Sequence, residues 1–200
     1  MRRNLLIKFI GLSFLIPFLF FFLYRKEKII VNSTDEQLIE NFDLILTKGQ
    51  SVQSKLLNLS NLSELQEYTH VGLVCKSNNH VSVLHATPDG TKENSIRYDN
   101  FQDFIDLSNA CGYRIMRYGN MTNEIRKLIQ TEVEKYKNSK IPFDYEFNNK
   151  ESNNIYCSEL IFLIYTESKA FKKECFNLKK PIDPNLFLSQ TDLVSITERN

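Results

Sequence analysis

The sequence predicts an α+β domain in which a mostly antiparallel sheet packs against a few helices. Short runs rich in Val, Leu and Ile, separated by polar residues, are typical of strands joined by turns. Residues 122–140 place their apolar side chains at the spacing of an amphipathic helix. Residues 157–171 are apolar on nearly all sides, which is typical of a helix buried at the centre of a domain. These observations favour one globular domain with a sizeable core.

Residues 1–28, before this domain, have the pattern of a membrane-spanning helix. A sixteen-residue run without charge, from Phe9 to Tyr24, lies between two groups of basic residues. Apolar residues upstream extend it to the ~20 residues that cross a bilayer. No small-residue cleavage site follows, so we expect an uncleaved transmembrane anchor rather than a removed signal peptide. Three Lys or Arg side chains lie on each side, and the free N-terminal amine favours an extracytoplasmic (periplasmic) domain.

Residues 29–42 read as a linker and entry segment, and residues 43–200 as the folded domain. Outside residues 1–28 the chain has 19 basic and 23 acidic side chains, so it is mildly acidic. The lack of a basic stripe argues against a nucleic-acid partner. The four cysteines, at positions 75, 111, 157 and 175, lack the short spacing of a zinc knuckle and are too few for a disulfide scaffold.

Turn residues and periodicity order the elements along the chain. Two Val-rich runs flank the polar turn "SNN" and predict a hairpin. Asn100 is placed to cap a short helix. The expected elements are a strand at 43–47, a helix at 52–59 capped by Ser51, strands at 70–76 and 80–86, a turn at 87–91, a helix at 99–107, a strand at 113–118, helices at 122–140 and 157–171, and a short strand near the C-terminus.

Cys157 stands where a polar loop meets the start of the apolar helix. The first turn of a helix carries a partial positive charge, which favours the thiolate and lowers the pKa of a thiol placed there. Because the thiolate is the nucleophile of cysteine hydrolases, this placement makes Cys157 a candidate nucleophile. A buried structural cysteine is the alternative interpretation.

All three histidines of the chain lie between residues 70 and 85. A hairpin that turns at "SNN" makes His70 and His85 approximate cross-strand neighbours and leaves His80 at the turn, in solvent. A histidine base with a second polar group that orients its ring is the arrangement that serves a cysteine nucleophile. An ordinary polar pair and a zinc site with Cys157 are the alternatives. No clear fourth ligand has metal spacing, so we expect no metal.

The stretches "DLILTKGQS", "YTHVGLV", "VLHA", "PFDYEF" and "YCSEL", in this order, resemble the NlpC superfamily of papain-like cysteine hydrolases. The histidines precede the cysteine, which is similar to the circularly permuted YiiX/YebB-like branch. The resemblance runs from about Asp43 to Ile196, nearly the whole predicted domain. It implies a papain-like α+β fold in which a helix that carries the cysteine packs against an antiparallel sheet that carries the histidine.

The resemblance also implies roles for individual residues. Cys157 matches the nucleophile, His70 the base, and His85 the third polar position, where YiiX-like relatives have Glu and other branches have His. Phe42 occupies a position where the family typically has Gly, so the tight turn is expected to differ there. Tyr156 is a candidate for polarising a substrate carbonyl or, equally, a packing aromatic, and the Cys157 backbone N–H is the better oxyanion donor.

These residues predict a membrane-anchored thiol hydrolase that cleaves an amide bond through an acyl-enzyme on Cys157, with no cofactor. The resemblance implies cell-wall peptides as the usual substrates, whereas related permuted branches act on lipid acyl groups. A lipid acyl hydrolase or acyltransferase with the same residues is therefore the alternative. A binding module that keeps the pocket without turnover is the third hypothesis.

Overall fold

The computed structural model describes residues 29–200 except for 50–66, 79, 92 and 150–152. The predicted membrane segment at 1–28 and the predicted helix at 52–59 therefore lie outside the described residues. Within the described part of the chain, no helix has the length and apolar character needed to cross a membrane.

Six strands form one antiparallel sheet, as predicted, in the order β4-β3-β2-β1-β5-β6. The predicted hairpin is present, because β2 and β3 pair directly from Ser77↔His80 to Leu73↔Leu84, and β2 is one of the two middle strands. The strands are β1 (Leu44–Gly49), β2 (His70–Ser77), β3 (His80–Thr91), β4 (Asn94–Asn100), β5 (Ala110–Tyr118) and β6 (Leu193–Arg199).

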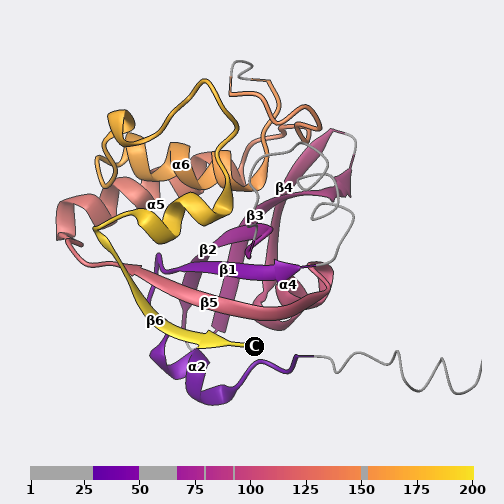
Figure 1. Cartoon of the computed structure of the whole chain (residues 1–200), viewed down its shortest axis with the longest axis vertical. Coiled ribbons are helices and arrows are strands. Elements are labelled where there is room, and N and C mark those ends of the chain that lie inside the picture. Colours follow the sequence, from indigo (N-terminus) through magenta and orange to yellow (C-terminus); the bar gives the residue numbers. More distant parts are fainter. Residues whose placement is uncertain (1–28, 50–66, 79, 92, 150–152) are drawn as a thin grey trace, which may run out of the picture.

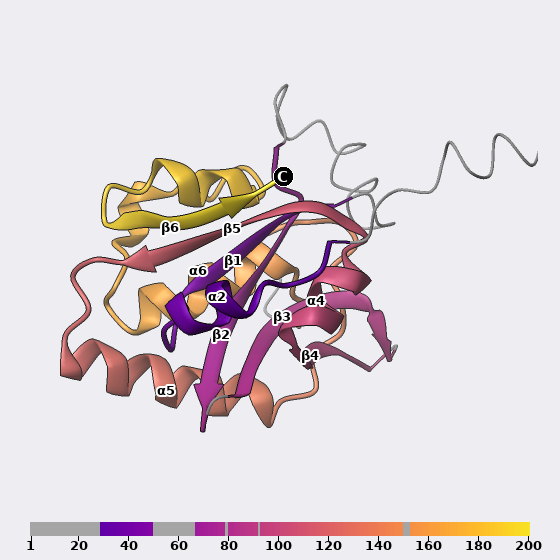
Figure 2. The same ribbon diagram turned by 90° about the horizontal axis from the view of Figure 1, so that it is seen from below.

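Helices cover both faces of this sheet (Figure 1, Figure 2). Helices α5 (Asn123–Lys137) and α6 (Cys157–Glu167) lie on one face, and α2 (Ser33–Leu38) and α4 (Phe101–Leu107) lie on the other. Two short 3-10 helices, η1 (Lys173–Cys175) and η2 (Pro184–Ser189), follow α6.

Side chains that alternate along the strands divide the core in two. Leu44 and Leu46 belong to the larger buried cluster, which includes the apolar side chains of α6. Ile45 belongs to the smaller cluster with Phe101 and Phe104 of α4. The α6 helix is buried on nearly all sides, as predicted, because the sheet, α5 and the segment after α6 surround it.

Side-chain caps start α4 and α5, and the cap of α4 is the predicted one. The Asn100 side chain accepts a hydrogen bond from the Asp103 backbone N–H at the start of α4. Thr122 caps α5 in the same way through the Ile125 N–H. Helix α6 begins at Cys157, which puts the thiol in the first helical turn, as expected.

The structure corrects three predictions of secondary structure. Residues 87–91, expected to be a turn, continue β3, and a register shift between Ala86 and Thr91 accommodates them. Strand β4 was missed, because its alternation of Asn, Ser, Arg and Asp with a few apolar residues gives a weak strand signal. The linker at 29–42 contains α2, which is held by the buried Asp35 through hydrogen bonds from Arg199 and Tyr113.

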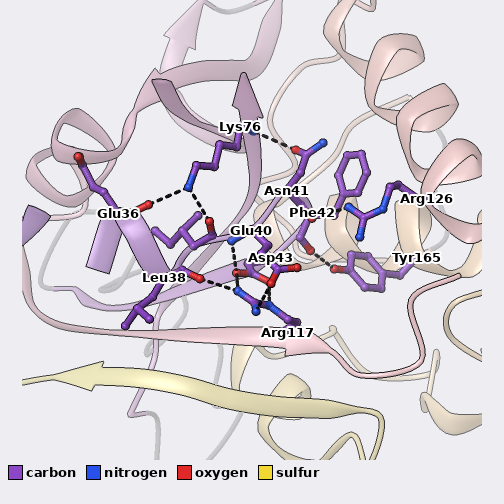
Figure 3. A network of polar contacts seen from close by, with 11 residues as sticks. Glu36, Leu38, Glu40, Asn41, Phe42, Asp43, Lys76, Arg117, Arg126 and Tyr165 are labelled. Carbon is purple, nitrogen blue, oxygen red and sulfur yellow. Dashed lines mark hydrogen bonds and ion pairs between the residues drawn. The ribbon is translucent and has the colours of Figure 1, made fainter. Parts of the chain in front are cut away.

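Phe42 keeps a tight turn before β1 although it is not glycine (Figure 3). Its φ is 73°, in the left-handed region that favours glycine. Surrounding hydrogen bonds hold this conformation: the Phe42 N–H donates to the Val74 carbonyl, and the Tyr165 hydroxyl donates to the Phe42 carbonyl. Asp43 accepts from Arg117 and from the Glu40 N–H. These contacts hold Phe42 in a backbone conformation that is strained for a residue with a side chain.

Candidate active site

The three candidate catalytic residues come from two neighbouring strands and the buried helix. His70 is the first residue of β2, His85 lies in β3, and Cys157 is the first residue of α6. All three side chains are almost fully buried, with at most 2% of their surface exposed. His80 is exposed at the β2–β3 turn, as predicted.

His70 and His85 are in direct contact, which confirms the prediction that the hairpin brings them together. His70 Nε2 and His85 Nδ1 are 2.9 Å apart. The register, which pairs Leu73 with Leu84, makes them diagonal neighbours on one face rather than directly opposed residues. Phe104 of α4 packs on both rings, with centroid separations of 5.2 Å to His70 and 4.9 Å to His85. The imidazole pair is therefore held in a fixed, largely dry position.

The hydrogen-bonded chain continues to a carboxylate that the sequence analysis did not find. His85 Nε2 lies 2.9 Å from Asp99 Oδ2. Arg97 in turn contacts both carboxylate oxygens, at 2.8 Å each. Asp99 was placed at the start of a predicted helix, whereas it lies in β4 beside β3. The alternation of Arg97 and Asp99 two residues apart was the available signal, and it is too short to identify a strand.

The thiol of Cys157 reaches the backbone of β2 next to His70. It interacts with the backbone N–H of Val71, with the Ser158 side chain and with its own helix-terminal N–H groups. The β2–β3 pairing ends at Leu73↔Leu84, before Val71 and His70. His70 and the backbone contact of the thiol therefore lie at the end of β2 that is paired with β1 and no longer with β3. The His70 ring packs on Phe104 of α4, whereas Val71 and Cys157 belong to the core cluster on the α6 face.

The structure corrects the prediction that the helix start lowers the pKa of Cys157. Burial raises the pKa of this thiol to about 11, although the Val71 N–H and the helix-terminal groups act in the opposite direction. A helix terminus contributes about 0.3–1 kcal/mol, and desolvation of a fully buried anion costs more. The thiol is consequently neutral at neutral pH.

His70 is also neutral, and one of its ring nitrogens has no hydrogen-bond partner among the residues that the structure describes. Burial, and then the neighbouring His85, hold its pKa well below the ordinary value. Among the described residues, nothing hydrogen-bonds to its buried Nδ1, and the same is true of the buried Oγ1 of Thr47. Thr47 is directly opposite His70 on β1. Two unpaired polar atoms on opposed residues mark a place where a hydrogen bond to another group can form.

Tyr156 points into the loops around the start of α6. Its hydroxyl accepts a hydrogen bond from the Ile182 N–H at 2.8 Å and donates to the Asn149 side chain. Both contacts are structural, because they join three loop segments. The hydroxyl is thus already engaged, and its expected role in polarising a carbonyl stays a prediction.

The described residues contain no group of three or more His, Cys, Asp or Glu side chains arranged to hold a metal ion. His70, His85 and Asp99 form a linear chain of pairwise contacts. Such a chain does not converge on one point, as the ligands of a zinc ion do.

Two comparisons with known proteins match this chain. A family model described as "Permuted papain-like amidase enzyme, YaeF/YiiX, C92 family" matches residues 39–187. The structure is similar to the crystal structure of the metalloprotein YiiX from Escherichia coli O157:H7, with a TM-score of 0.59 and 19% sequence identity. That similarity covers 80% of this chain and 97% of YiiX. A search of curated proteins gave no match.

Proposed function

The chain belongs to the permuted papain-like amidase family, and from this premise we propose that it hydrolyses a peptide-type amide bond through an acyl-enzyme on Cys157. The observation that carries the proposal is the contact of 2.9 Å between His70 and His85, in which His70 directly precedes Val71, the residue of β2 whose backbone N–H interacts with the Cys157 thiol. In the part of the chain that the structure describes, Nδ1 of His70 has no hydrogen-bond partner, and the thiol contacts the backbone of the next residue, Val71. A nucleophile, a base and an orienting group are the components that acyl transfer needs.

In the proposed reaction, His70 Nδ1 takes the proton of Cys157 while the sulfur attacks the carbonyl carbon of the substrate. The backbone N–H of Cys157 is the candidate donor to the oxyanion that forms. The C–N bond then breaks, and the imidazolium of His70 gives its proton to the leaving amine. Water attacks the thioester with His70 again as base, which releases the carboxylic acid and restores the thiol.

The protonation states favour proton transfer during attack over a preformed ion pair. The pKa of Cys157 is raised to about 11 and that of His70 is lowered, both mainly by burial, so both groups rest in their neutral forms. Among the described residues no hydrogen bond joins them, and His70 Nδ1 is unpaired. Catalytic contacts of this kind commonly tighten when substrate binds.

For the substrate we propose a cell-wall or other peptide, and for the location an extracytoplasmic domain anchored by residues 1–28. The anchor rests on the sequence pattern of residues 1–28, and the peptide substrate rests on the amidase family. The intact mass of protein from the membrane fraction tests whether residues 1–28 are retained, and protease protection in sealed vesicles tests the orientation. Loss of residues 1–28 from the mature protein would contradict the anchor.

The metal named for YiiX is not extended to this chain. The described residues near the proposed nucleophile provide pairwise contacts only, and they gather no group of three or more potential ligands. The proposed reaction therefore uses no step through a metal.

The test uses the full-length chain in detergent, with peptidoglycan fragments as the peptide substrate and p-nitrophenyl acetate to trap the acyl-enzyme. We expect an acetyl group on Cys157, loss of hydrolysis in Cys157→Ala and a strong reduction in His70→Ala. Cys75→Ala is the matched control, because Cys75 of β2 is a buried thiol of the same core cluster and burial also raises its pKa to about 11.

Mass spectrometry of the products separates the alternatives. Cleavage of phospholipids in place of peptides would support the lipid acyl hydrolase, and no turnover of either would support a binding module. Wild-type hydrolysis by Cys157→Ala would exclude the proposed nucleophile.

A further inference from the structure

We infer that Asp99, held by Arg97, is a positioning residue that decides which ring nitrogen of His70 is free to take a proton. The inference rests on the proposed function, because it concerns the base of that reaction. It starts from a chain of polar contacts that crosses three neighbouring strands, from Asp99 in β4 through His85 in β3 to His70 in β2.

The first step is the charge of Asp99, which is only slightly exposed. Burial alone would raise its pKa, but hydrogen bonds from His85 and Arg97 outweigh burial and lower the pKa to about 2. The group is therefore a carboxylate at any pH at which the protein would work, and a carboxylate only accepts hydrogen bonds.

The second step is the proton position on His85. Its Nε2 is 2.9 Å from the Asp99 carboxylate, so this nitrogen carries the hydrogen and donates it. His85 is buried, and Arg97 already pairs with both oxygens of Asp99, so we take the His85 ring as neutral. The other nitrogen, Nδ1, then carries a lone pair and accepts, and a doubly protonated His85 in the NMR spectrum would overturn this step. The opposite tautomer would place a lone pair against a carboxylate oxygen in a buried site, which is strongly unfavourable.

The third step shows how the tautomer of His85 determines the tautomer of His70. Since His85 Nδ1 accepts, the His70 Nε2 at 2.9 Å must carry the hydrogen and donate. The lone pair of neutral His70 is thereby placed on Nδ1, the buried atom that has no partner among the described residues. The carboxylate is two side chains away from the base, and yet it determines which nitrogen of the base is unprotonated.

Arg97 keeps the carboxylate in place. Its Nε contacts Asp99 Oδ2 and its terminal nitrogen contacts Oδ1, both at 2.8 Å, so the carboxylate is held on two sides. Oδ2 is the same oxygen that accepts from His85. Arg97 is also directly opposite His85 in the β3–β4 register. The residue that holds the Asp99 carboxylate is therefore the cross-strand partner of the histidine that donates to it.

The experiment reads the tautomers directly from ¹⁵N NMR of the histidine rings in the full-length chain in detergent. The chain has three histidines, and the exposed His80 is an internal reference. In the wild type at neutral pH we expect His70 and His85 both to be protonated on Nε2 alone. In Asp99→Ala we expect mixed tautomers for His70, because no carboxylate then fixes the proton of His85 on its Nε2.

The same variants are then compared in rate. Acylation of Cys157 by p-nitrophenyl acetate should fall about 10- to 100-fold in Asp99→Ala, with the urea unfolding midpoint close to wild type. The acylation rate should fall less in Asp99→Asn than in Asp99→Ala, because the amide oxygen can still accept a hydrogen bond from His85. Asp99→Asn also gives a result if the alanine variant does not fold. Asp103→Asn is the matched control, because Asp103 is an exposed acid of α4 whose carboxylate contacts Asn100 and not a histidine.

Three outcomes overturn the inference. Unchanged tautomers with an unchanged rate mean that Asp99 has no influence on His70. A rate loss with wild-type tautomers and a lowered unfolding midpoint means that Asp99 and Arg97 only stabilise β4. Altered tautomers with a wild-type rate mean that the reaction does not depend on which ring nitrogen of His70 carries the proton. The NMR result does not depend on turnover, so failure of the proposed nucleophile in Cys157→Ala is distinguishable from all three.

Discussion

Replacing Gly72 by alanine is expected to disturb both the stability of the domain and the imidazole pair. A Cβ at this position would lie 2.3 Å from Val83 Cγ1 and 2.9 Å from Phe104 Cε2. Ordinary contact begins at 3.4 Å, so the valine methyl group must move by about 1 Å. Valine has little rotamer freedom in a strand, and Val83 is fully buried, so the backbone or Phe104 must yield.

The expected loss of stability is about 1–3 kcal/mol, the usual range for one extra methyl group in a packed core. At a urea dependence of about 2 kcal/mol/M this lowers the unfolding midpoint by roughly 0.5–1.5 M. The same displacement reaches the candidate site, because Phe104 packs on His70 and His85. We therefore expect the acylation rate of Cys157 to fall as well, under conditions where the protein remains folded.

Gly119→Ala is the matched control, since its Cβ would meet nothing closer than the Asp192 carbonyl oxygen at 3.7 Å. Its stability should stay within about 0.5 kcal/mol of wild type. The double variant Gly72→Ala/Val83→Ala removes the clashing methyl group and should be more stable than the sum of the two single effects predicts. A Gly72→Ala protein that unfolds like Gly119→Ala, or strict additivity in the double variant, would refute the packing argument.

Two further predictions concern a strained turn and a buried acid. Phe42→Gly should be more stable than Phe42→Ala by about 1 kcal/mol in urea unfolding, although both lose the buried ring, because the φ of 73° favours glycine. The usual order, with alanine the more stable, would contradict the strain. Burial, and then Asp144, raise the pKa of Glu159 to about 8. The folded state then holds a proton that the unfolded chain has lost, so stability should fall as pH rises from about 4.5 to about 8, by up to ~1.4 kcal/mol per pH unit. Glu159→Gln should lack this fall in unfolding midpoints measured across that range, and an identical pH dependence would show that Glu159 titrates normally.

Local signals were sufficient for the centre of the fold. The hairpin turn and the alternation around it identify β2 and β3, and from them the contact of His70 with His85. The apolar run after Cys157 identifies the buried helix and the first-turn position of the thiol. These features depend on periodicity and on residues close together in the chain, which a sequence displays directly.

The surroundings of the site could not be predicted in the same way. Strand β4 is polar and half-exposed, so its pairing with β3 is not visible as a pattern, and Asp99 was assigned to a helix start. The pKa of Cys157 was predicted to be low from the helix start alone. Desolvation depends on how many other segments cover the thiol, and it outweighs the helix terminus.

The amino-acid sequence thus contains the family, the central hairpin, the cysteine at the helix start and the two histidines that meet across the strands. Tertiary structure was needed to bring Asp99 and Arg97 to the far side of His85, to bury the thiol and the imidazole in neutral forms, and to retain the turn at Phe42. The physical reason is the range of the interactions. Periodicity and capping act within a few residues, whereas burial, electrostatics and cross-strand hydrogen bonds arise from segments that meet only in the folded chain.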